Sequence, residues 1–180
     1  MNKNTDIVID STLELRVRQI EDAAAIFALV DRNRNYLRER LPWVDSTKSV
    51  KDTEGYIQSC LNASPIIDFG IWYDNQWVGS IGFHQIDQTN KKADIGYWLA
   101  EIFTRKGIVS RSVEALINYG FAELKLNQLT ITVAPENIRS LGIPKSLGFV
   151  KERVLRQSEL VNGKYLDGVV YSMLKSEWKK

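Results

Sequence analysis

The chain has 180 residues, 44% of them hydrophobic and 26% charged, which supports a folded domain and excludes a disordered polymer. Its 24 basic and 22 acidic residues leave a net charge of +2, and this near balance argues against a general nucleic-acid binder. One cysteine, Cys60, excludes an internal disulfide; because the sequence shows neither a signal-peptide core nor an apolar run of ~18 residues, we expect a cytoplasmic protein.

The N-terminal third of the chain is predicted to contain one strand and three helices. Residues 1–10 are polar and are expected to form a flexible segment ahead of a single domain at 11–180. The strand alternates apolar and charged residues, as half-buried strands do. The helix after it opens with acidic residues, and the next helix stops before a proline. The strand is expected at 13–20 and the helices at 23–33, 35–41 and 49–61.

The remainder is predicted to contain six strands and two helices. The pairs Asp74-Asn75 and Asn162-Gly163 have the composition of hairpin turns. Hairpins followed by a strand-helix-strand unit predict a mixed sheet with helices on its faces, an α/β or α+β architecture. The strands are expected at 66–73, 76–87, 93–100, 128–134, 149–160 and 164–174, and the helices at 107–124 and just before Gly148.

A short basic turn with one glycine connects the strand at 93–100 to the helix at 107–124. Unpaired N–H groups and the dipole at the start of a helix suit a phosphate or pyrophosphate. Gly107 permits close approach to the backbone, and Arg105, Lys106 and Arg111 supply positive charge. A Walker loop and a dinucleotide fingerprint are excluded by the residues present. On this stretch alone, a structural turn with solvated basic side chains is the alternative.

The wider pattern resembles the GNAT superfamily of acetyl-CoA-dependent N-acetyltransferases over nearly the whole chain. A strand ending in YWL, the glycine turn and an amphipathic helix precede a strand ending APEN, with GF eleven residues later. The branch that acetylates ribosomal-protein serine N-termini is similar in further segments: LPWVD at 41–45, GYWLA at 96–100, NIRS at 137–140, IPKSLGF at 143–149 and LRQSEL at 155–160. The resemblance implies a mixed, mostly antiparallel seven-stranded sheet, with helices on both faces and a splay between the fourth and fifth strands.

The resemblance also implies acetyl-CoA as co-substrate and places its contacts. In the superfamily the turn reads Gln/Arg-x-x-Gly-x-Gly/Ala, and this chain departs from it at Thr104 and Val109. A backbone N–H within Trp98-Leu99 would stabilise the oxyanion, and Asn137 would contact the pantetheine arm. The diphosphate would be cradled by Arg105, Lys106, Gly107, Ile108, Val109 and Ser110.

Two side chains are implied as catalytic. Many members place a tyrosine seven positions after the asparagine, but that position is Pro144 here. Ser140 matches the serine that assists the leaving thiolate in the ribosomal-serine branch, and Glu159 matches the proposed base. The alternatives are a helix N-cap for Ser140 and a surface strand residue for Glu159.

The acceptor groove is expected to be lined by Trp43 and Tyr97, beside Trp98, although aromatic residues in these elements also suit a core. The single histidine, His84, is interpreted as a half-exposed packing residue of its strand and is not assigned a catalytic role. One cysteine and one histidine form no metal cluster.

The function that these residues indicate is acetyl transfer to a primary amine by direct attack in a ternary complex. The attacking amine must be neutral. The pKa of a protein α-amine is about 7.7–8.0, whereas deprotonating a lysine amine at neutral pH costs roughly 4 kcal/mol. A protein N-terminus, that of a ribosomal protein in particular, is therefore the favoured acceptor. The alternatives are a small amine (polyamine, amino sugar or antibiotic) and a non-catalytic module that binds coenzyme A or a peptide. No nucleic acid or membrane partner is expected, and a homodimer through the C-terminal hairpin is left open.

Overall fold

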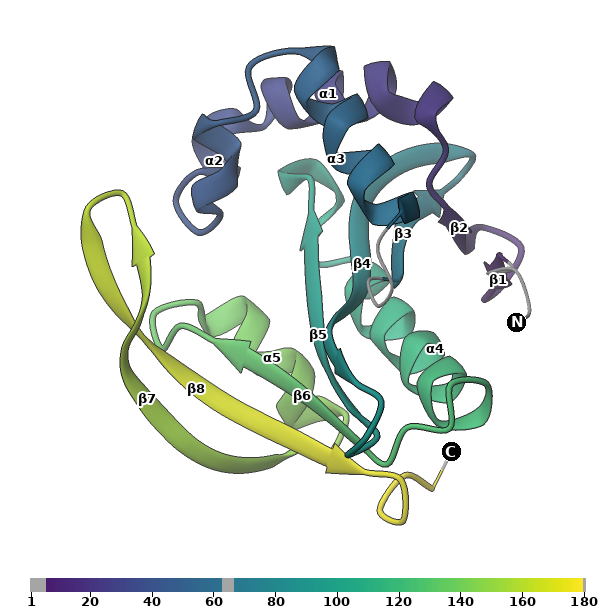
Figure 1. The fold of residues 1–180 in the computed structure, drawn as a ribbon, viewed down its shortest axis with the longest axis vertical. Coiled ribbons are helices and arrows are strands. Elements are labelled where there is room, and N and C mark those ends of the chain that lie inside the picture. Colours follow the sequence, from purple (N-terminus) through teal and green to yellow (C-terminus); the bar gives the residue numbers. More distant parts are fainter. Residues whose placement is uncertain (1–5, 63–66, 180) are drawn as a thin grey trace.

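The computed structural model describes residues 6–62 and 67–179. Eight strands form one sheet in the order β1-β2-β3-β4-β5-β6-β8-β7 (Figure 1). Every neighbouring pair is antiparallel except β5 and β6. The strands are β1 (Ile7–Val8), β2 (Leu13–Val17), β3 (Ile67–Tyr73), β4 (Gln76–Asp87), β5 (Lys92–Leu99), β6 (Gln128–Val133), β7 (Val150–Val161) and β8 (Lys164–Leu174). The predicted mixed, mostly antiparallel sheet is therefore confirmed.

Helices cover both faces of the sheet, as predicted. The helices are α1 (Ala23–Arg32), α2 (Arg34–Leu37), α3 (Val50–Asn62), α4 (Ile108–Ala122) and α5 (Ile138–Ser146), with 3₁₀ turns η1 (Ile20–Asp22), η2 (Pro42–Asp45) and η3 (Glu101–Phe103). None of these described helices is long and apolar enough to cross a membrane.

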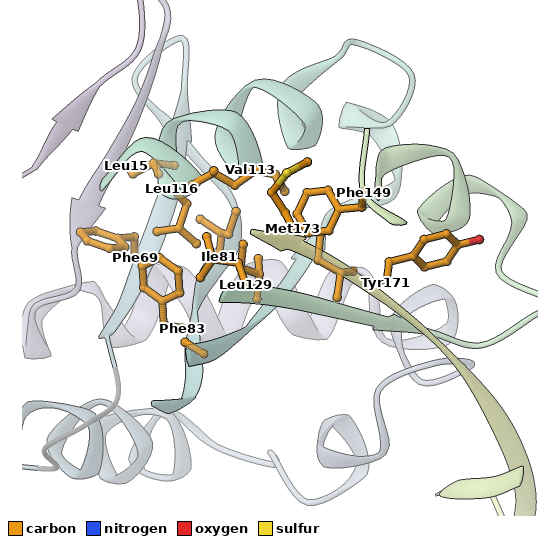
Figure 2. Close-up of a cluster of buried hydrophobic side chains, with 14 of the residues drawn as sticks. Leu15, Phe69, Ile81, Phe83, Val113, Leu116, Leu129, Phe149, Tyr171 and Met173 are labelled. Carbon is orange, nitrogen blue, oxygen red and sulfur yellow. The ribbon is translucent and has the colours of Figure 1, made fainter. Parts of the chain in front are cut away.

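Two hydrophobic cores hold the helices to the sheet. The larger core joins β2–β6 and β8 to α4 and α5, and Figure 2 shows part of it, including Leu116 of α4 and Leu129 of β6. The second core lies on the opposite face, where Ile26 of α1 and Ile57 of α3 are buried with Trp77 of β4. Because successive strand residues point to opposite faces, β4 contributes to both cores.

The sheet opens between β5 and β6, the fourth and fifth strands of the predicted seven. These strands pair in parallel only at their first residues, from Lys92↔Gln128 to Asp94↔Thr130. Beyond Asp94 the two strands diverge, so the second half of β5 presents an edge inside the sheet. The predicted splay is confirmed.

Both predicted hairpin turns are present. The turn residues Asp74 and Asn75 have φ of 49° and 58°, and Asn162 and Gly163 have φ of 51° and 75°. Positive φ at both central residues is the type I′ signature, which matches the twist of the flanking strands.

The N-terminal segment and the second helix differ from the sequence-based expectation. Ile7–Val8 pairs with β2, so part of the segment predicted to be flexible adds an eighth strand to the seven expected. The helix predicted at 35–41 is the four-residue α2, because Asn33 ends α1 and the chain turns toward η2. Residue 66, the predicted start of β3, lies outside the described residues.

Candidate active site

The glycine turn begins α4 beside the open edge of β5. Gly107 is the N-cap of α4 with φ of 70°, a left-handed conformation that glycine adopts without steric cost. Arg105, two residues earlier, also has positive φ, 65°. Nothing lies within 4 Å of the position that a Cβ on Gly107 would occupy. The turn therefore leaves open space above its backbone, and the residues present fit a diphosphate there.

The first turn of α4 offers unpaired backbone donors at this place. Arg111 is the first residue whose N–H bonds back into the helix, to the Gly107 carbonyl at 3.1 Å. The N–H groups of Ile108, Val109 and Ser110 precede this bond and have no intrahelical partner. They carry the partial positive charge of the helix N-terminus. Backbone donors for a phosphate group are therefore available at the glycine turn, where the sequence predicts them.

The three basic side chains near the turn differ in availability. Arg105 is exposed. The Lys106 ammonium lies over the rings of Tyr73 and Phe103, 5.7 and 5.3 Å from their centroids. Arg111 forms an ion pair with Asp10. A carboxylate distant in sequence therefore lies beside Arg111, and the contribution of Arg111 to positive charge at the turn stays a prediction.

The open edge of β5 presents backbone N–H groups toward the splay. Ala100 donates its N–H to Val78 of β4 at 2.9 Å. Backbone groups alternate sides along a strand, so the N–H groups of Tyr97 and Leu99 point away from β4. Of the predicted pair Trp98-Leu99, Leu99 therefore carries the N–H that faces the splay.

Helix α5 begins at Asn137, whose side chain caps it. Asn137 Oδ1 accepts the N–H of Ser140 at 3.3 Å, and Asn137 is the N-cap. The alternative interpretation of Ser140 as the N-cap is therefore wrong, because Asn137 fills that position. The amide nitrogen of Asn137 is not used by the cap, so the predicted contact with the pantetheine arm stays a prediction.

A hydrogen bond connects β5 to α5 across the splay. The Tyr97 hydroxyl donates to the Ser140 carbonyl at 3.3 Å. Burial raises the pKa of Tyr97, which keeps the hydroxyl protonated as a donor. Tyr97 thus positions the helix that carries Ser140, and it also lines a cavity of the protein.

We expect Tyr97→Phe to lower kcat by about three- to tenfold, since a neutral hydrogen bond contributes about 0.5–1.5 kcal/mol. The KM for acetyl-CoA should change less, because the turn at Gly107 is untouched. Steady-state kinetics test this. An unchanged kcat would show that the bond does not position Ser140, and Tyr119→Phe in α4 is the matched control.

Glu159 lies near the tip of the long β7–β8 hairpin. It pairs with Leu166, and cross-strand partners share a face of the sheet. Partial burial of the carboxyl raises its pKa above the usual value, as suits a base, while the residue as a whole remains exposed. Asn162 donates to the Arg38 carbonyl at 2.9 Å and so ties the hairpin tip to the region after α2. No hydrogen bond or ion pair joins Glu159 to Ser140 among the described residues, so its role stays a prediction.

A cavity of about 400 Å³ lies between the sheet and the α1–α3 layer. Trp43, Tyr97 and Trp98 all line it, and its use as the acceptor groove stays a prediction. The Trp43 and Trp98 rings are 5.9 Å apart between centroids and tilted by 55°. Its size suits a small ligand or the end of a peptide. Because Trp98 belongs to β5, the cavity adjoins the strand that has the open edge.

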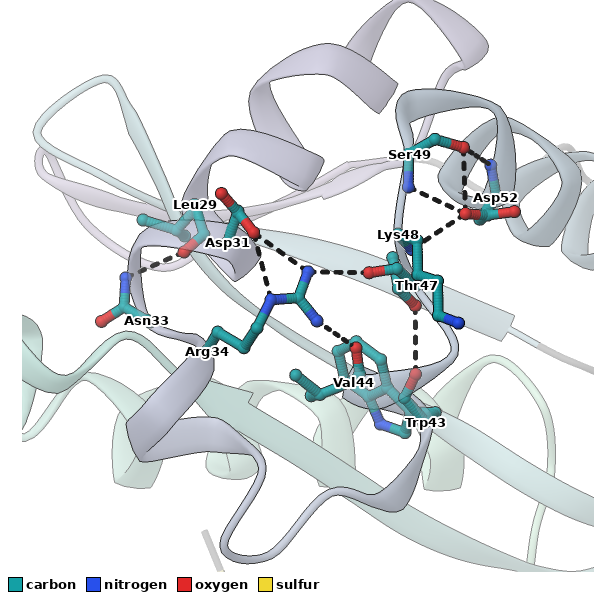
Figure 3. Close-up of polar contacts among 10 residues, drawn as sticks. All are labelled: Leu29, Asp31, Asn33, Arg34, Trp43, Val44, Thr47, Lys48, Ser49 and Asp52. Carbon is teal, nitrogen blue, oxygen red and sulfur yellow. Dashed lines mark hydrogen bonds and ion pairs between the residues drawn. The ribbon is translucent and has the colours of Figure 1, made fainter.

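The loop that carries Trp43 is fixed by Arg34 (Figure 3). The Arg34 guanidinium donates to the carbonyls of Val44 at 2.5 Å and Thr47 at 2.8 Å, and also to Asp31 at 3.1 Å. One side chain thus holds the end of α1, η2 and the segment just after η2 together. The sequence signals none of this, since the acceptors are backbone carbonyls.

Sequence reasoning missed polar residues in the wall of this cavity. His84, which was assigned no role, lines the cavity, and a Cβ on Gly96 would lie 2.8 Å from its ring. Arg18 and Asp68 also line it and form an ion pair at 3.0 Å. Arg18 lies inside the strand predicted at 13–20 as one of its alternating charged residues, so the pattern carried no signal that it would be buried in a cavity wall. No group of three or more metal-binding side chains occurs in residues 6–62 and 67–179.

A parallel β5–α4–β6 unit with a glycine turn, a splayed edge and an adjoining cavity is the arrangement that the resemblance to acetyl-CoA-dependent acyl-transferring enzymes implies. Residues 12–150 match the family described as the Acetyltransferase (GNAT) domain, and the chain belongs to this family.

Individual relatives are similar over almost their whole length. "Putative ribosomal N-acetyltransferase YdaF" of Bacillus subtilis is 34% identical over 95% of this chain and 96% of its own. The structure of RimL, a ribosomal L7/L12 alpha-N-protein acetyltransferase in complex with coenzyme A, has a TM-score of 0.91 at 28% identity, covering 96% of this chain and 99% of its own. The structure of the microcin C7 self-immunity acetyltransferase MccE in complex with acetyl-CoA and AMP has a TM-score of 0.90 at 26% identity, covering 96% and 97%.

Proposed function

We propose that this enzyme acetylates the N-terminal α-amine of a protein, a ribosomal protein in particular. Similarity to YdaF and RimL supports the acceptor class. A protein α-amine is favoured over a polyamine by one observation: the bonds that the cavity's two carboxylates, Asp52 and Asp68, already make within the protein.

Both carboxylates already accept several hydrogen bonds from the chain. Asp52 accepts the N–H groups of Lys48 and Ser49 at 2.9 and 2.8 Å. Asp68 accepts from Arg18, Tyr56 and Ser80 at 2.9–3.0 Å. The Arg18 guanidinium balances the charge of Asp68, whereas the N–H donors to Asp52 are neutral and leave its charge in place. A polyamine brings several further cationic amines, and one unbalanced carboxylate offers too few partners for them. The cavity therefore favours an acceptor with one amine.

In this proposal the backbone donors of α4 hold the diphosphate and thereby aim the thioester along β5. The Leu99 N–H stabilises the developing oxyanion. Ser140 hydrogen-bonds the leaving sulfur, and Glu159 accepts the proton of the amine, directly or through water.

Acceptor choice is expected to follow amine basicity. At pH 7 a peptide with a free α-amine should react about two orders of magnitude faster than a capped peptide with one lysine, because far more of the α-amine is neutral. The rate with the α-amine should level off above about pH 8, whereas the rate with lysine should keep rising toward about 10.4. Thiol release measured between pH 6 and 10 gives both profiles. Equal rates at pH 7 would contradict the proposal.

A second candidate is a small amine that carries a flat ring. It is favoured by the tilted Trp43–Trp98 pair in the cavity and by the similarity to MccE, whose structure holds AMP. A panel of peptides, polyamines, amino sugars and aminoacyl nucleotides, incubated with acetyl-CoA, separates the candidates by thiol release. No release with any amine would support the non-catalytic alternative.

A further inference from the structure

Two buried donors in the cavity wall have no partner. Arg18 is 6% exposed and Thr53 is 4% exposed, and both line the cavity. Within the described residues, Arg18 Nε and Thr53 Oγ1 are buried without a hydrogen-bond partner. Because an unbonded buried donor is unfavourable, these atoms call for an oxygen supplied by whatever occupies the cavity.

The surroundings of Arg18 prevent its guanidinium from turning elsewhere. Arg18 Nη2 bonds Asp68 at 3.0 Å, and its guanidinium lies 5.5 Å from the Tyr56 ring centroid and 5.9 Å from that of Trp77. Asp68 and Arg18 together carry no net charge, and Asp68 also accepts the hydroxyls of Tyr56 and Ser80. The Arg18 Nε–H and the Thr53 hydroxyl thus remain free to donate, while the charge of Arg18 is already balanced by Asp68. Such donors match a neutral oxygen rather than an anion.

Arg18 and the open edge of β5 lie at opposite ends of one row of paired residues. Val17 pairs with Phe69, which places Arg18 beside Asp68. Asp68 pairs with Gly82 and Gly82 with Gly96, so the row crosses from β2 to β5. Three strand spacings amount to roughly 14 Å between backbones, but the Arg18 side chain crosses much of this distance: its Nη2 bonds Asp68 Oδ1, which lies 3.1 Å from the position of a Cβ on Gly82. About one strand spacing is left to Gly96, above which the His84 ring lies. An acceptor whose amine reacts at β5 thus reaches the donors through a side chain several bonds long.

We propose that Arg18 Nε and Thr53 Oγ1 form a specificity site for a neutral carbonyl or hydroxyl oxygen at the end of the acceptor group that enters the cavity. The inference rests on the proposed function, for which the entering group is the first side chain of a peptide, such as glutamine or asparagine. A site built to hydrogen-bond a ligand oxygen discriminates strongly against an analogue of the same shape that lacks it.

Paired peptides test the site. They differ only in the first residue, as the pairs Gln/Met, Asn/Leu and Thr/Val, whose members are similar in shape. The kcat/KM ratio within a pair should favour the oxygen-bearing member, by roughly tenfold or more for Gln/Met, and the preference should shrink for the shorter Thr/Val pair. Ratios near one in every pair would overturn the proposal and would indicate that water satisfies the two donors.

Substitutions assign the preference to the two residues. Thr53→Val removes a hydroxyl that bonds no other described residue, so folding should be retained and the Gln/Met ratio should fall severalfold, whereas Thr53→Ser should preserve the ratio. Arg18→Lys keeps a cation beside Asp68 but lacks the Nε–H, and should lower the ratio similarly. Thermal denaturation identifies any variant that fails to fold. A ratio that persists in both Thr53→Val and Arg18→Lys would sink the assignment.

Binding measured without turnover separates this inference from the proposed function. Glutaminamide and methioninamide are titrated into the enzyme with coenzyme A, and the intrinsic tryptophan fluorescence, to which Trp43 and Trp98 in the cavity contribute, is followed. Tighter glutaminamide binding that depends on Thr53, without acetylation of any peptide, would uphold the specificity site and reject the peptide acceptor. Peptide acetylation without discrimination would do the reverse, and neither binding nor acetylation would reject both.

Discussion

Replacing Gly107 with alanine is expected to weaken acetyl-CoA binding about tenfold or more. Gly107 has φ of 70°, and an L-residue with a Cβ pays roughly 1–2 kcal/mol in that region. The chain relieves this strain by rotating the turn, which redirects the N–H groups of Ile108, Val109 and Ser110 away from the diphosphate. If the turn holds, the new methyl group occupies the open space above the backbone and blocks the ligand instead. Calorimetric titration with acetyl-CoA measures either loss, since 1.4 kcal/mol corresponds to a factor of ten.

Gly163 provides a matched control for this prediction. It has φ of 75°, and a Cβ there also meets nothing within 4 Å, but it lies in the β7–β8 turn. Gly163→Ala should therefore lower the melting temperature about as much as Gly107→Ala, while acetyl-CoA affinity stays at the wild-type value. Equal affinity in all three proteins would mean that the Gly107 turn does not hold the coenzyme.

Local sequence signals predicted most of the fold for identifiable reasons. The two hairpins depend on turn residues that tolerate positive φ, and the pairs Asp74-Asn75 and Asn162-Gly163 are of this type. Helix α4 follows from an amphipathic pattern after a glycine. The splay, in contrast, was implied only by the resemblance to a family, because no local pattern specifies where two parallel strands part.

The polar contacts of the site could not be predicted, because they join residues far apart in the chain. Asp10 neutralises Arg111 from a position 101 residues away, and Asp68 meets Arg18 across 50 residues. Such pairs depend on which strands become neighbours. The same limit explains why Arg18 and Thr53 were missed: a buried donor without a partner is a property of the packed structure.

The helix cap is a different case, since both candidates were visible. Asn137 and Ser140 are each good N-cap residues by type, and their three-residue spacing allows either one to start the helix. The structure has Asn137 in the cap, with the Ser140 N–H as its donor. This arrangement leaves the Ser140 hydroxyl outside the cap and bears directly on the test of its role.

Ser140→Ala is expected to lower kcat by about ten- to a hundredfold while acetyl-CoA affinity changes little. Both hydrogen bonds that position Ser140 use its backbone: the N–H donates to Asn137 and the carbonyl accepts from Tyr97. Alanine preserves both, so the substitution isolates the hydroxyl, whose bond to a developing thiolate is charge-assisted and worth about 1.5–3 kcal/mol. Single-turnover rates of thiol release measure the chemical step without product release. Ser146→Ala removes a hydroxyl that bonds the Ile143 carbonyl in the same helix and should leave the rate intact. If Ser140→Ala had the same single-turnover rate as Ser146→Ala, the Ser140 hydroxyl would have no role in the chemical step. Ser140 would then contribute only through its backbone hydrogen bonds.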